Sequence, residues 1–155
     1  MIVSRTPFRV SFFGGGTDLP EFYLKHTGRV LSTSIDKYMY LFVHKFFDER
    51  IQIKYSKTEL VEKISDIKHP LAREILKKFN LNGIDINSIA DIPAGTGLGS
   101  SSSYTVGLLK SLYKYSGIEI KKQDLAEEAS FIEINILREP IGKQDQYASA
   151  FGGLN

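Results

Sequence analysis

The sequence predicts an α+β domain in which strands come first along the chain and helices follow. Three observations support this. β-branched and aromatic residues are concentrated early, apolar residues recur at helical spacing late, and a glycine-serine loop joins the two parts. The length of 155 residues suits one domain, and 42% hydrophobic with 25% charged residues is ordinary for a globular protein. The order of elements does not fit a regular βαβ array.

The first part of the chain contains most of the expected strands and one short helix. The apolar run at residues 10–13 is broken by three consecutive glycines, and residues 19–25 have a helical pattern that ends at a Thr-Gly pair. Residues 29–36 and 38–46 are rich in β-branched and aromatic residues, which predicts two strands. Apolar and polar residues alternate over 51–55, which indicates a half-exposed strand.

The middle and last parts of the chain contain the expected helices. The densely charged middle segment predicts solvated helices at residues 58–67 and 70–79, followed by a strand at 83–92. Apolar residues at helical spacing then predict a helix over residues 104–115. Residues 125–136 show the same spacing and are expected to form one further helix.

Charge and composition exclude several classes of function. Lys and Arg total 20 against 18 Asp and Glu, so the net charge of +2 leaves no basic excess for holding a nucleic-acid backbone. The absence of cysteine excludes disulfides, thiolate nucleophiles and Cys-ligated metals. The longest uncharged run, residues 92–109, is interrupted by glycines and serines, and the first residues lack the apolar core of a signal peptide. We therefore expect a cytoplasmic protein without a nucleic-acid or membrane partner.

The most informative segment is the loop at residues 91–103, between a predicted strand and a predicted helix. Gly95, Gly97 and Gly99 alternate there, and four serines follow. Such glycines let a ligand approach the backbone, and free N–H groups at the helix start favour an anion such as a nucleotide phosphate. The serines can cap the helix, bond phosphate oxygens or ligate magnesium. No lysine completes a P-loop, and Ser100 stands where a Rossmann fingerprint needs glycine, so the simpler alternative is a flexible loop with a serine cap.

Three segments together resemble the motifs of the GHMP kinases, a family that includes galactokinase, homoserine kinase and mevalonate kinase. The glycine-serine loop, from Pro93 to Ser102, resembles the phosphate-binding motif of the family. Residues 6–18 resemble its N-terminal substrate motif, and residues 142–153 resemble the aspartate loop of its sugar-kinase branch. The Gly-Gly-Gly-Thr-Asp and Gly-Lys-Gln-Asp-Gln forms are most similar to those of heptose 7-phosphate kinases, with fucokinases close by. The resemblance covers essentially the whole chain.

The resemblance implies a mixed sheet with helices packed on one side, similar to a domain of ribosomal proteins, and ATP and Mg²⁺ as cofactors. Asp145 would act as a base or orient the accepting hydroxyl, and Arg9 would stabilise charge on the transferred phosphoryl group. Ser101 and Glu133 would ligate Mg²⁺. The substrate would contact Gly15, Gly16, Thr17, Asp18 and Asp145, and the nucleotide would contact Pro93, Gly95, Gly97, Leu98, Gly99, Ser100, Ser101 and Ser102.

Several of these residues also have an ordinary structural interpretation. Asp145 can be an exposed turn residue, Arg9 a surface strand arginine and Glu133 a solvated helical glutamate. Asp18 can instead serve as the N-cap of the helix that starts beside Pro20, a role that would compete for its oxygens.

We expect ATP-dependent phosphorylation of the anomeric hydroxyl of a sugar or sugar phosphate, with D-glycero-D-manno-heptose 7-phosphate first and fucose or galactose next. Two alternatives stay open: a nucleotide- or sugar-binding module without turnover, and an RNA-binding domain. Because members of the family are longer, residues 1–155 are expected to form the N-terminal domain, incomplete at its C-terminal end and without the C-terminal domain, with weak or no turnover alone. An exposed sheet edge would then favour self-association.

Overall fold

A five-stranded sheet forms one layer of the molecule, which is described for residues 1–155 by a computed structural model. β3 runs parallel to β5, and the other neighbouring strands pair antiparallel, so the sheet is mixed. The last residues of the chain pair with the start of β2, where Thr33 forms a bridge with Leu154. The strands lie in the order β1 (Ile2–Phe13), β2 (Leu31–Lys45), β5 (Ile84–Ala90), β3 (Ile51–Lys54) and β4 (Thr58–Val61).

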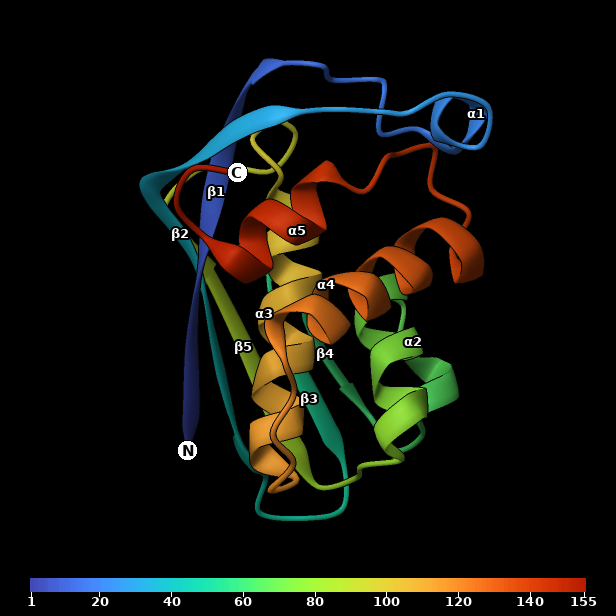
Figure 1. The fold of residues 1–155 in the computed structure, drawn as a ribbon. Helices are drawn as coiled ribbons and strands as arrows, with labels where there is room; N and C mark the ends of the chain where they lie inside the picture. The colour runs from blue at the N-terminus through green and yellow to red at the C-terminus, as the bar shows by residue number, and fades with distance from the viewer.

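The long helices cover one face of this sheet (Figure 1). The four-residue helix α1 (Pro20–Tyr23) lies apart from them, at one end of the molecule. The α+β class and the packing of helices on one side agree with the sequence-based prediction. The four helices on the covered face are α2 (Pro70–Phe79), α3 (Ser100–Tyr115), α4 (Lys122–Ser130) and α5 (Gln144–Phe151).

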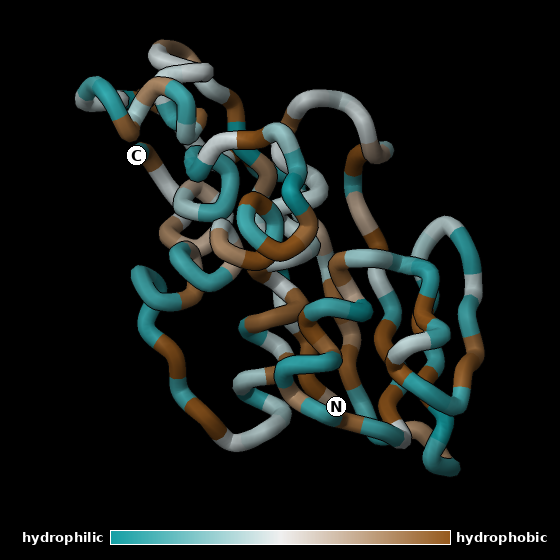
Figure 2. Tube along the Cα trace, turned by 90° about the vertical axis from the view of Figure 1, so that its right-hand side faces the viewer, coloured by the Kyte–Doolittle hydropathy of each residue, from teal (hydrophilic) through white to brown (hydrophobic).

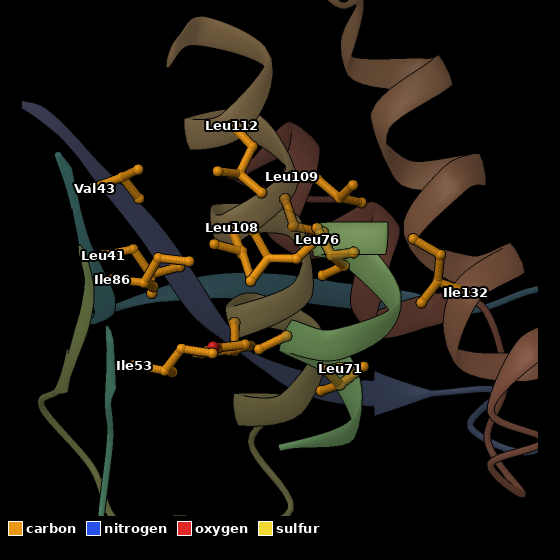
Figure 3. Packing of buried hydrophobic residues seen from close by; sticks show 14 of the residues in the cluster. Leu41, Val43, Ile53, Leu71, Leu76, Ile86, Leu108, Leu109, Leu112 and Ile132 are labelled. Carbon is orange, nitrogen blue, oxygen red and sulfur yellow. The ribbon is translucent and has the colours of Figure 1, made fainter. Parts of the chain in front are cut away.

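The hydrophobic core lies between the sheet and α3. Figure 3 shows apolar side chains of the strands facing those of α3, with side chains from α2 and from the segment after α4 on the far side. Inward-facing residues of β2 are buried at every second position, as the pleat of a strand requires. The core residues labelled in Figure 3 that are fully buried are Leu41, Val43, Ile53, Leu76, Ile86, Leu108, Leu109 and Leu112.

Hydrophobic, intermediate and hydrophilic stretches are interspersed along the chain, as the brown, white and teal bands of Figure 2 show. None of the helices combines the length and the apolar character that crossing a bilayer requires. The uncharged run at residues 92–109 divides instead into an exposed loop and the first part of α3.

Two predictions for the first half of the chain are wrong. Residues 29–36 and 38–46 do not form two strands, because Asp36 and Lys37 continue in β2 as exposed residues within a single strand. Residues 58–67 do not form a helix. They form β4 and a short 3₁₀ helix, η1 (Ile64–Asp66), because β4 pairs antiparallel with β3 and completes the edge of the sheet.

Two predictions for the second half need correction as well. The expected helix over residues 125–136 is α4 followed directly by a π-helix, η2 (Phe131–Ile136). Arg138, just after η2, has φ of 57°, a left-handed conformation that ends the helical segment before Pro140. Residues 144–151 form α5, where a loop was expected. The buried face of α5 consists of small and polar residues such as Ala148 and Ser149, so no large apolar residues marked that face in the sequence.

Candidate active site

The glycine-serine loop connects β5 to α3 and leaves the start of that helix open. Gly95, Gly97 and Gly99 have φ of 81°, 72° and 80°, a region in which other residues are strained. Gly99 is the N-cap and has no side-chain bond, and the first helical hydrogen bond runs from Ser103 N to Gly99 O at 2.9 Å. The N–H groups just before Ser103 therefore have no partner within the helix and can donate to an anion. The serine cap of the simpler interpretation is not formed.

Two cavities meet beside this loop. The first, of about 320 Å³, is lined by glycines of the loop and by residues 100–102, and we call it the loop cavity. The second, of about 500 Å³, is lined by Gly15, Gly16 and Asp18, and we call it the turn cavity. The residues that line both cavities are Arg9, Gly97, Ile141 and Asp145.

Arg9 and Asp145 form a bidentate ion pair in the wall that the two cavities share. Arg9 Nε donates to Asp145 Oδ1 at 2.7 Å, and Nη2 donates to Oδ2 at 2.8 Å. The third nitrogen, Nη1, donates to Gly97 O at 2.7 Å, and the backbone N–H of Arg9 donates to Leu98 O at 3.1 Å. Arg9 therefore fixes the carboxylate and the glycine loop relative to each other. A Cβ added to Gly99 would lie 3.3 Å from Asp145 Oδ2, so the missing side chain leaves room for this carboxylate.

Asp145 lies in the first turn of α5 and not in a loop as predicted. Its side chain is 25% exposed and that of Arg9 is 12% exposed, so neither is the solvated surface residue of the simpler interpretations. The positive end of the α5 dipole lies beside the carboxylate and favours its negative charge. The arrangement offers a fixed carboxylate that faces both cavities.

Asp18 connects the turn that contains Gly15 and Gly16 to the start of α5. Its Oδ1 accepts from Gly16 N at 2.9 Å, and its Oδ2 accepts from Gln144 N at 3.1 Å. The N-cap of α1 is Leu19, without a side-chain bond, so the interpretation of Asp18 as that cap is wrong. Thr17 is directed elsewhere, because its hydroxyl bonds Gly14 O, Arg29 O and Arg29 N and it lines neither cavity.

Glu133 lies behind the loop cavity and is fully buried, which excludes the solvated interpretation. Its Oε2 accepts from Ser102 Oγ and from Gln146 Nε2, both at 2.8 Å, while its Oε1 has no hydrogen-bond partner. Burial raises the pKa of Glu133, and the charge of Asp145 adds to that rise, while the nearby side chains of Thr105, Ser102 and Gln146 oppose it only in part. Ser101 lines the loop cavity, but the serine that contacts Glu133 is Ser102. A shared Mg²⁺ between Ser101 and Glu133 stays a prediction.

The remaining predicted residues divide between the two cavities and the surface. Ser100 lines the loop cavity and Leu98 lines the turn cavity, whereas Pro93 is exposed and lines neither. Sequence reasoning missed Ser11, whose hydroxyl donates to Gln144 Oε1 at 2.7 Å in the wall of the turn cavity. It also missed Gln146, although the Gln-Asp-Gln sequence around Asp145 placed a glutamine on each side of the proposed catalytic residue.

Comparisons with known proteins identify the family of this chain. The sequence profile of the GHMP kinases N terminal domain matches residues 59–153. This chain belongs to the GHMP kinase family. It is 32% identical to a D-glycero-alpha-D-manno-heptose 7-phosphate kinase of Campylobacter jejuni over 99% of this chain and 49% of that protein. It is 27% identical to a galactokinase of Thermosipho africanus over 95% of this chain and 42% of that protein.

The solved structures of family members show the same fold. A D-glycero-D-manno-heptose 1-phosphate kinase from Bacteroides thetaiotaomicron superposes with a TM-score of 0.90 at 28% identity, over 100% of this chain and 55% of that one. A mevalonate kinase structure superposes with a TM-score of 0.81 at 22% identity, over 99% of this chain and 52% of that one, a likeness of fold alone. The chain thus spans about half the length of these GHMP kinases.

Proposed function

We propose that this chain is the nucleotide- and sugar-binding part of an ATP-dependent kinase acting on the anomeric hydroxyl of D-glycero-D-manno-heptose 7-phosphate. The product would be the 1,7-bisphosphate, formed in the cytoplasm. The observation that supports this best is the Arg9–Asp145 pair in the wall shared by the two cavities. Phosphoryl transfer needs a donor and an acceptor held on either side of such a group.

In this proposal the loop cavity binds the phosphates of ATP. The free N–H groups at the start of α3 and the serines at residues 100–102 would donate to phosphate oxygens. Ser101 and Glu133 would hold Mg²⁺, which neutralises phosphate charge when bound. The donor set fits this hard cation, because Glu133 Oε1 is a carboxylate oxygen without a partner, and Ser102, which bonds Oε2 of the same carboxylate, lines the loop cavity beside Ser101.

The turn cavity would bind the sugar. Gly15 and Gly16 let the backbone approach it closely, and the carboxylate of Asp18 lines the same wall. Asp145 would orient the anomeric hydroxyl and accept its proton while the hydroxyl oxygen bonds to the γ-phosphorus and ADP leaves with the electrons of the broken P–O bond. Arg9 would keep the carboxylate in place and stabilise negative charge on the transferred group.

Binding can be tested on residues 1–155. Transfer is tested on a protein of the relatives' full length that contains them, because these residues alone are expected to turn over weakly or not at all. We expect MgATP and heptose 7-phosphate each to bind in isothermal titration. We expect Asp145→Asn to keep ATP affinity while lowering ADP release in the presence of the sugar by roughly 10²- to 10⁴-fold. A folded sample that binds no nucleotide would contradict the proposal. A preference for fucose or galactose would identify another sugar kinase. Binding of both ligands without ADP release by the full-length protein would identify a binding module.

A further inference from the structure

The carboxylate of Glu133 is held through one of its two oxygens. Ser102 Oγ and Gln146 Nε2 both donate to Oε2, and Oε1 is buried without a partner. The hydroxyl of Thr105 is close enough to help lower the pKa of Glu133, but the hydrogen bond that it donates goes to Ser101 O at 3.1 Å and leaves Oε1 unpaired. A buried oxygen without a hydrogen-bond partner is destabilising, so the protein keeps one acceptor open at the expense of stability.

Gln146 is the donor that ties this carboxylate to α5. Gln146 is fully buried, its Nε2 donates to Glu133, and its own Oε1 has no partner. The amide orientation is therefore determined by the carboxylate, since the flipped amide would set its carbonyl against a carboxylate oxygen. Gln146 directly follows Asp145, so the first turn of α5 carries both the residue of the shared wall and the support of Glu133.

The two donors differ in what surrounds them. Ser102 lies at the start of α3 and lines the loop cavity, where it is one of the serines available to a bound phosphate or cation. Gln146 is fully buried and lines neither the loop cavity nor the turn cavity. If Ser102 turns toward a ligand, the hydrogen bond from Gln146 is the remaining restraint on the orientation of Glu133.

We propose that Gln146 is a positioning residue that binds Oε2 of Glu133 and thereby keeps Oε1 directed to a divalent cation of the nucleotide site. The inference rests on the proposed function, because it assumes that Glu133 meets a cation there. Hydrogen bonds that orient metal-binding carboxylates matter quantitatively, and their loss typically costs about 10- to 100-fold in metal affinity.

The test measures metal affinity rather than turnover. ATP affinity is determined by isothermal titration in EDTA and at a series of Mg²⁺ concentrations, for the wild type and for Gln146→Met, which removes the donor and keeps an unbranched side chain. We expect the Mg²⁺ concentration for half of the metal effect to rise by about 10-fold or more, with ATP affinity in EDTA unchanged. Ser149→Ala is the matched control, because Ser149 is buried on α5 and bonds Ser103 and Pro7 but not Glu133.

The outcomes separate this inference from the proposed function. Wild-type protein that binds no nucleotide or shows no Mg²⁺ effect overturns the proposed function itself. A Gln146→Met protein with the wild-type Mg²⁺ dependence overturns the positioning role alone. An equal loss in Ser149→Ala also overturns it, since instability of α5 would then be the cause. If Gln146→Met does not fold, Gln146→Asn replaces it, because the shorter amide should still weaken the bond to Glu133 and raise the Mg²⁺ requirement.

Discussion

Glu59 and Glu133 are both buried carboxylates, yet the protein treats them in opposite ways. Glu59 accepts from Tyr55 OH at 2.9 Å, from His69 N at 3.0 Å and from Lys68 N at 2.6 Å, so both of its oxygens are bonded. Glu133 receives two donors on one oxygen and none on the other. Every carboxylate oxygen of Glu59 is used in the folded structure, whereas one oxygen of Glu133 is still available as an acceptor.

The pKa values follow the same division. Burial acts to raise the pKa of Glu59, but the hydrogen bonds from Lys68, Tyr55 and His69 together outweigh it and lower that pKa. At Glu133 burial prevails, and the pKa is raised. Glu59 lies where β4 leads toward α2, away from both cavities, whereas Glu133 lies directly behind the loop cavity. The difference supports a structural role for Glu59, whose oxygens are all bonded, and is consistent with the metal-binding role that we propose for Glu133.

The largest expected effect is at the satisfied carboxylate. Glu59→Leu would leave the N–H groups of Lys68 and His69 and the hydroxyl of Tyr55 without their acceptor. We expect the free energy of unfolding to fall by about 3 kcal/mol, measured by urea denaturation at pH 7. Glu119→Gln, at an exposed glutamate paired with Lys114, is the control and should change little. An equally small change in unfolding free energy in both variants would contradict the structural role of Glu59.

The opposite sign is expected at the unsatisfied carboxylate. Glu133→Gln keeps one oxygen for Ser102 and Gln146 and removes a buried charge. We expect the free energy of unfolding at pH 7 to rise by about 1 kcal/mol in the same denaturation experiment. The effect of Mg²⁺ on ATP binding should disappear in the same variant. A loss of stability comparable to that of Glu59→Leu would instead make Glu133 a structural group and contradict the interpretation.

The site was more predictable from the sequence than parts of the fold were. The glycine loop was predicted from the spacing of its own residues, whereas Arg9 and Asp145 were predicted from the resemblance to the GHMP kinases, and the structure brings the three together. The strand β4 was missed because its charged residues suggested a solvated helix, while pairing with β3 decided its conformation. Tertiary pairing of this kind leaves little local signal.

Hydrogen bonds from buried residues to the residues of the site could not be predicted from the sequence either. Gln146 ends the Gly-Lys-Gln-Asp-Gln motif, but the motif does not show what the residue does, and its proposed role follows only from a hydrogen bond across 13 residues to Glu133 in a π-helix. The two roles of Asp18 were left open for the same reason, because the sequence does not show that Gln144 N lies within reach of its carboxylate. Residues that bond a distant backbone group or a buried carboxylate become recognisable only when the chain is folded.

The smallest expected effect concerns pH. Because the folded pKa of Glu59 lies below its ordinary value of 4.5, its stabilising contribution should be complete above that value and should be lost as pH falls through the folded pKa. Glu59→Gln removes the titration. We therefore expect the difference in unfolding free energy between wild type and Glu59→Gln to stay constant from pH 7 to about 5.5, and then to narrow toward pH 3 in urea denaturation.

Glu133→Gln should behave oppositely, because a raised folded pKa makes the wild type lose stability as pH increases. The difference in unfolding free energy between wild type and Glu133→Gln should therefore grow with pH. Parallel pH profiles for the two variants would show that the two carboxylates are equivalent after all.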